Sequence, residues 1–92
     1  MLLEFEIVKI FFHHNRGHFI FVKYLGENDD FEVANGAVFG DIPIYHYKEL
    51  QPIVENEDKS QTKYFVFRPT SLKWFPEGHF KVGQHVTLAT PD

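Results

Sequence analysis

The chain has 92 residues, a formal net charge of −4 and no Cys. A chain of this length holds one hydrophobic core, so residues 1–92 are predicted to form a single domain. The absence of Cys from this sequence excludes disulfides, thiolate metal sites and a cysteine nucleophile. The acidic balance disfavours duplex DNA as a partner, because charge-driven duplex binding requires a basic face.

A tight hairpin is predicted at the start of the chain. Residues 3–12 (LEFEIVKIFF) alternate apolar and polar side chains, and the alternation changes phase after Ile7. Such a change indicates a β-bulge or a stretch buried on both faces. Residues 18–25 (HFIFVKYL) predict the second strand, and Asn15 and Gly17 tolerate the positive φ of a tight turn.

A second hairpin is predicted within residues 31–39 (FEVANGAVF), because Asn35-Gly36 between short apolar arms is the strongest short hairpin signal. Residues 40–47 (GDIPIYHY) predict a further strand. Pro43 has no N–H to donate, so this strand is expected at a sheet edge or with a late start.

The last third of the chain also predicts strands. The polar run 55–62 reads as an exposed loop, and 63–68 (KYFVFR) as a strand that ends in a kink at Pro69. Residues 79–89 alternate, which predicts a strand bent at Gly83. The apolar face of that strand would hold Phe80, Val82, Val86 and Leu88.

These elements together predict an all-β fold: a closed or nearly closed antiparallel β-barrel of about six strands. The sequence has 11 Phe, which favours strands and thick cores. Glu4, Glu6 and Lys9 interrupt the first apolar stretch, so neither a signal peptide nor a membrane helix is expected. We therefore expect a cytoplasmic protein with no membrane partner.

Three short motifs carry a family resemblance. Phe67, Arg68 and Thr70 form Phe-Arg-x-Thr, residues 76–78 form a Pro-Glu-Gly turn, and Gly83 lies three residues before Val86. This pattern resembles the β-barrel domains of translation elongation factors of the Tu type, although Gln84 stands where that family has Asp, and Pro69 interrupts the first motif.

The resemblance implies a translation-factor-like barrel that docks on a protein or on structured RNA. The sequence contains no GxxxxGK[ST] loop, so the resemblance does not imply GTP hydrolysis.

The segment around the Pro69 kink is the predicted contact surface. An aromatic side chain beside an Arg is typical of protein and RNA contacts. The alternative is that the aromatic pair at 74 and 75 plugs one end of the barrel. The candidate partner-binding residues are Arg68, Trp74, Phe75 and His79.

His13, His14 and His18 are weaker candidates for a metal site, since neutral imidazoles bind Zn²⁺ or Cu²⁺. Adjacent His residues in a strand point to opposite faces, so at most two converge easily. No metal or other cofactor is therefore expected, and a small ligand- or metal-binding barrel remains an alternative function.

No nucleophile motif surrounds Ser60 or Ser71, so we do not expect an enzyme. Phe11, Phe19 and Phe21 exceed what alternation buries in one small core. An exposed apolar face would mark an interface, which makes a homodimeric structural protein the other alternative. The leading hypothesis is a non-catalytic binding module that docks on a protein or on structured RNA.

Overall fold

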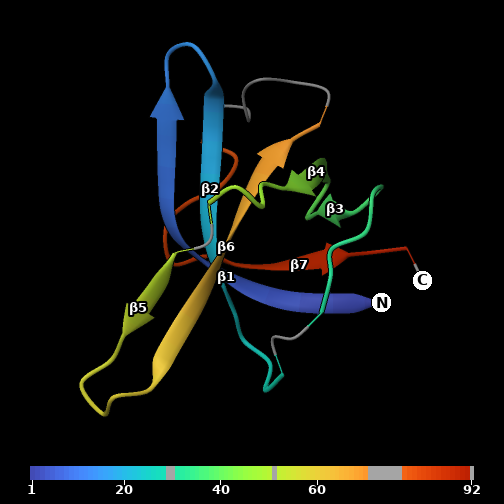
Figure 1. The fold of residues 1–92 in the computed structure, drawn as a ribbon. Helices are drawn as coiled ribbons and strands as arrows, with labels where there is room; N and C mark the ends of the chain where they lie inside the picture. Colours follow the sequence, from blue (N-terminus) through green and yellow to red (C-terminus); the bar gives the residue numbers. More distant parts are fainter. Residues whose placement is uncertain (29–30, 51, 71–77, 92) are drawn as a thin grey trace.

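The computed structural model describes residues 1–28, 31–50, 52–70 and 78–91, and none of these residues is helical. No helix among them could therefore span a membrane. The described strands are β1 (Leu2–His13), β2 (Gly17–Tyr24), β3 (Val38–Phe39), β4 (Ile42–His46), β5 (Ile53–Glu55), β6 (Gln61–Pro69) and β7 (His85–Ala89) (Figure 1).

Six of these strands close into an antiparallel barrel, as the sequence predicts. Their order is β2-β1-β7-β3-β4-β6, and the pairing of β2 with β6 closes the ring. In that closing pair Ile20 lies opposite Phe67, and Lys23 lies opposite Tyr64. The remaining strand, β5, lies outside the barrel and pairs with the first residues of β6. Figure 1 shows the β5–β6 hairpin extending away from the barrel.

The predicted bulge and first hairpin are both present. The register of β1 against β2 shifts between Ile7 and Lys9. There the Gly83 N–H donates to the Ile7 carbonyl oxygen at 2.7 Å, which continues the β1–β7 contact beyond the paired strands. The bulge therefore lies where β1 stops pairing with β7 and continues to pair with β2 alone. At the turn, Gly17 has a φ of 91°.

The barrel interior is filled by aromatic rings packed edge to face. The ring of Phe5 lies 5.3 Å from that of Phe67 and 5.6 Å from that of Phe65, centroid to centroid. Phe39 packs against Phe67 at 5.3 Å. All of these side chains are fully buried. Each such pair adds about 0.5–1.5 kcal/mol beyond the burial of its apolar area.

The prediction of a hairpin around Asn35-Gly36 is wrong. A turn is present there, but residues 31–34 join no strand. The hairpin forms instead between β3 and β4, and Gly40, with a φ of 64°, provides the tight turn. Val33 and Ala37, the apolar residues on either side of the predicted turn, pack against the core rather than pair with each other.

The edge position predicted for Pro43 is wrong, because β4 pairs with β3 on one side and with β6 on the other, but the alternative of a late start fits the β4–β6 ladder, which begins at Ile44. The fold tolerates this proline because it lies near the end of the β4–β6 ladder. Its carbonyl oxygen accepts the Thr70 N–H at 3.1 Å, so the missing donor removes only a terminal hydrogen bond.

The strand predicted over 79–89 is shorter than expected, because β7 begins at His85. Gly83 has a φ of 91°, which takes the chain out of the extended conformation. The alternation therefore fails before this point: Phe80 is buried as predicted, whereas Val82 is 63% exposed. Gly83 lies in the turn that leads into β7 rather than in the middle of a strand.

Candidate binding site on the outer barrel face

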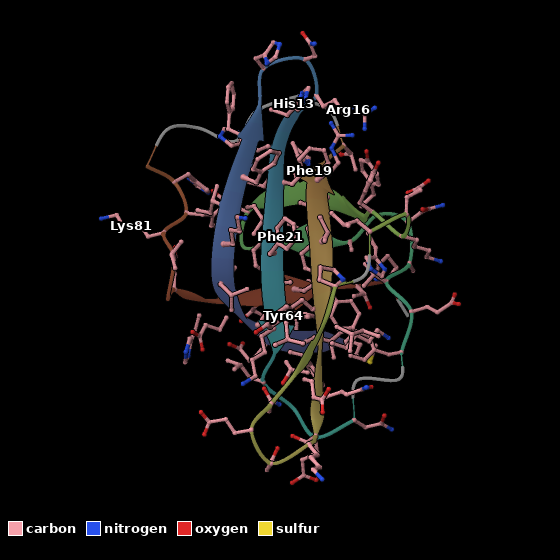
Figure 2. All side chains as sticks on the ribbon, turned by 60° about the vertical axis from the view of Figure 1, so that its left-hand side comes forward. His13, Arg16, Phe19, Phe21, Tyr64 and Lys81 are labelled. Carbon is pink, nitrogen blue, oxygen red and sulfur yellow. The ribbon has the colours of Figure 1, made fainter. Side chains whose placement is uncertain are left out.

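One outer face of the barrel carries aromatic side chains from neighbouring strands. Along β2, Ile20 and Val22 belong to the core. Phe19 and Phe21 alternate with them and therefore point outward. Figure 2 shows Phe19, Phe21 and Tyr64 following one another down this face, with His13 and Arg16 at the hairpin end. We call it the outer face, with outward side chains Lys9, Phe11, Phe19, Phe21, Tyr45, Tyr64, Val66 and Arg68.

Part of the outer face is buried although it lies outside the barrel core. Val66 is fully buried and Phe19 is 6% exposed, yet neither belongs to the core cluster. The chain contacts both residues as it leaves β4. The Tyr47 N–H donates to the Val66 carbonyl oxygen at 2.8 Å, and the Tyr47 ring packs edge-on against Phe19 at 5.4 Å. The segment after β4 thus builds a second, smaller apolar cluster.

Arg68 completes this cluster. The carbon at the centre of its guanidinium lies 4.5 Å from the Phe19 ring centroid, 5.7 Å from that of Tyr47 and 6.0 Å from that of Tyr45. Its Nη2 donates to the Arg16 carbonyl oxygen. Its Nε is buried and has no hydrogen-bond partner in the part of the chain that the structure describes. Arg68 therefore links β6 to the β1–β2 turn through stacking and one hydrogen bond.

An open hollow of about 460 Å³ lies next to this cluster, between the β1–β2 hairpin and the segment that follows β4. Phe19 and Tyr47 belong to both the hollow and the buried cluster, whereas Phe11 is 42% exposed. The hollow is lined by Phe11, His13, Asn15, Arg16, Phe19, Phe21, Tyr47, Glu49 and Leu50.

The surroundings of the hollow are cationic although the whole chain is acidic. The Lys9 ammonium lies 5.9 Å from the Phe11 ring centroid and 5.8 Å from that of Phe21. Arg16 lies on the rim at the hairpin end, where Figure 2 shows it beside His13. Glu49 is the acidic residue of the described lining. The site thus combines ring faces with nearby positive charge.

The structure places the predicted contact residues in different positions. Arg68 lies on the outer face, whereas Trp74 and Phe75 fall outside the described residues. His79 lies elsewhere: its Nε2 is 2.5 Å from Asp41 Oδ1, and its ring packs edge-on against Phe80 at 4.7 Å. The described contacts of Arg68 and His79 share no residue.

The three histidine candidates do not form one metal site: His13 and His14 lie together, and no third ligand joins them among the described residues. The rings of His13 and His14 stack at 5.0 Å, and the Asn15 N–H donates to His13 Nδ1 at 3.2 Å. The His18 ring packs against Phe12 at 5.3 Å, and burial lowers the pKa of His18. Within the described ranges no group of three or more His, Cys, Asp or Glu side chains is arranged to hold a metal ion.

Sequence reasoning identified Phe11, Phe19 and Phe21 as surplus to the core but did not connect them with Arg68. It missed Tyr47 and Leu50, because the residues that line the hollow come from segments about 30 residues apart in the chain. The signal that could have found the site is the outward phase of three Phe residues on paired strands.

No protein-family model, curated protein or solved structure matches this chain.

Proposed function

We propose that this protein is a non-catalytic binding module that docks on structured RNA or on a protein through its outer face. The observation that carries the proposal is the hollow of about 460 Å³ beside the exposed Phe11, with Lys9 and Arg16 next to it. Aromatic rings and Arg side chains are enriched where partners bind, and an apolar hollow on the surface marks an interaction site.

The side chains that line the hollow also favour a binding role over a catalytic role. The described lining of the hollow offers ring faces, a guanidinium, an amide and a carboxylate, but no Ser, Thr or Cys. Its His13 already accepts a hydrogen bond at Nδ1 from the Asn15 N–H. A nucleophile hydrogen-bonded to a neighbouring base is the usual basis of covalent catalysis, and in the described part of the chain no hydrogen bond joins two side chains of this lining.

The resemblance of Phe67, Arg68 and Thr70 to a Tu-type elongation factor motif belongs to the same proposal. In this interpretation the barrel is a cytoplasmic, translation-factor-like module. Arg68 supports the contact surface from beneath, because its guanidinium stacks on Phe19 rather than extending into solvent. The partner would then touch mainly Phe11, Phe21 and the hairpin end.

Two neighbouring residues provide a matched test of this proposal. Phe11 and Phe12 are 42% and 52% exposed, and they point to opposite sides of β1. Tagged wild-type protein, Phe11→Ser and Phe12→Ser would be incubated with lysate of the source organism, and the bound RNA and protein would be identified.

We expect wild type and Phe12→Ser to retain the same partner and Phe11→Ser to lose it. Thermal melts of the variants serve as the folding control. The same retained material in all three samples, or no retained material in any of them, would overturn the proposal.

A further inference from the structure

We infer that the hollow at the hairpin end is a subsite for one unpaired nucleotide of an RNA, its base against the Phe11 ring and its phosphate near Arg16. This inference rests on the proposed binding function and names the partner of the same site.

The size and lining of the hollow suit a single planar group. A volume of about 460 Å³ lies within the range of small-ligand sites, roughly 300–1,000 Å³. The ring of Phe19, already covered by Arg68 and Tyr47, forms a fixed floor. Phe11 remains exposed and packs against Phe19 with the ring centroids 6.0 Å apart. An exposed ring above a fixed floor is the arrangement on which extruded bases stack.

The charges around the hollow favour an anionic partner. Lys9 reaches the Phe11 and Phe21 rings, and Arg16 lies on the rim, so positive charge flanks the ring faces on two sides. Stacked bases bring phosphates to such positions. Glu49 does not oppose this reading, because a carboxylate accepts hydrogen bonds from the amino groups of bases.

The same features favour RNA over other occupants. A bound amphipathic helix needs a groove with anchors at i, i+3, i+4 and i+7. This hollow is instead a local depression formed by one hairpin and one loop. A duplex would need a broad basic face, which a chain with a net charge of −4 does not favour. An unpaired nucleotide needs only one ring face and a few cations.

The test measures RNA binding directly by fluorescence anisotropy. The probes are a labelled single-stranded RNA of roughly 12 nucleotides, a stem-loop that carries unpaired bases, and a blunt duplex. Wild type is expected to bind the first two probes and to bind the duplex much more weakly. Phe11→Ser should weaken binding by roughly tenfold or more, because one stacked base is lost. Phe12→Ser is the control and should bind like wild type.

The phosphate contact has its own measurement. Affinity would be followed between about 50 and about 200 mM salt for wild type and for Arg16→Gln. Loss of one phosphate contact should reduce the slope of log affinity against log salt by about one. Lys81→Gln is the matched control, since Lys81 extends away from this face (Figure 2) and is expected to leave the slope unchanged.

Three results would overturn the inference. The first is duplex binding as tight as single-stranded binding, and the second is an equal effect of Phe11→Ser and Phe12→Ser. The third is no RNA binding at all. If the lysate experiment then retains a protein through Phe11, only the RNA inference fails, whereas a homodimer that Phe11→Ser dissociates, with no retained partner, would overturn the proposed function as well. If none of these experiments finds an interaction that depends on Phe11, the proposed function fails as well.

Discussion

The barrel interior and the outer face both bury aromatic side chains, but different parts of the chain cover them. Inside, Phe5, Phe65 and Phe67 are enclosed by the closed ring of strands. Outside, the Phe19 ring packs against Tyr47 and the Arg68 guanidinium, and Val66 is buried where the segment that follows β4 hydrogen-bonds to its carbonyl oxygen. The interior thus depends on closure of the sheet, whereas the outer cluster depends on a loop and a cation. The outer face can therefore change with less effect on the barrel.

The largest expected effect comes from the interior. Phe67→Ala removes a fully buried ring that packs against Phe5 and Phe39, and we expect it to lower the free energy of unfolding by about 3–5 kcal/mol. Urea unfolding monitored by circular dichroism measures this loss as a lower midpoint with an unchanged m-value. Phe67→Leu, which keeps most of the volume, should cost clearly less. Equal losses would show that the cavity is not the cause.

The adjacent residue tests the outer cluster. Val66→Ala leaves the core cluster intact and removes two methyl groups from a fully buried side chain of the outer face, so we expect a loss of about 2 kcal/mol by the same measurement. A loss of less than about 0.5 kcal/mol, as for an ordinary surface substitution, would mean that the outer cluster contributes little to folding. A loss as large as that of Phe67→Ala would remove the distinction between the two regions.

The stability of the protein is expected to depend on pH through His46, whose ring centroid lies 5.2 Å from that of Phe65. Burial, followed by the nearby Lys48 and Lys63, lowers the pKa of His46. The unfolded chain, with a His pKa of about 6.5, therefore binds more protons than the native state at mildly acidic pH. The stability linked to this group is complete above pH 6.5 and is lost as the pH falls through the lowered pKa.

His46→Phe keeps a ring in place of the titrating imidazole, so the stability of this variant should fall less steeply between about pH 7 and about pH 5. A full proton difference corresponds to about 1.4 kcal/mol per pH unit, which sets the upper limit of the change. Urea midpoints at several pH values measure the slope. The exposed His14→Gln serves as the control, and an unchanged slope in His46→Phe would contradict the prediction. His18, whose pKa burial also lowers, contributes to the slope that remains.

The smallest effect on stability is expected at the exposed rim. Phe11→Ser should change the free energy of unfolding by less than about 1 kcal/mol, because Phe11 is 42% exposed and packs against one side of Phe19. The same substitution has the largest expected effect on binding. A small effect on stability together with a large effect on binding distinguishes a residue of a recognition surface from a residue of the folding core. A destabilisation comparable to that of Val66→Ala would assign Phe11 to the outer cluster instead.

Much of the barrel follows from local pattern. Alternation identified the β1–β2 hairpin, and the change of phase after Ile7 located the bulge, because both signals depend on neighbouring residues. Local pattern failed at Asn35-Gly36, where the arms pack into the core instead of pairing. It also failed at Val82, since one positive φ at Gly83 ends the alternation. In both cases tertiary packing decides between turns that the sequence makes equally acceptable.

The candidate site was less predictable than the fold. Arg68 was selected from its place beside the Pro69 kink, but its neighbours Phe19 and Tyr47 come from distant segments. His79 was grouped with it because the two lie near one another in the chain, yet Asp41 holds His79 elsewhere. Period-two alternation says which side of a strand a residue faces. It does not say which loop will cover that side.

The pairing of Leu2 with Ala89 gives the barrel a seam between strands from opposite ends of the described chain. Such non-local closure is slow, with folding times of roughly milliseconds to seconds, whereas a hairpin like β1–β2 forms in about 1–10 μs. During synthesis the first hairpin therefore exists before β7 has been made, with its Phe-rich inner and outer faces both uncovered. Transiently exposed apolar strands aggregate readily. The incomplete chain is thus expected to be more prone to aggregation than the finished barrel.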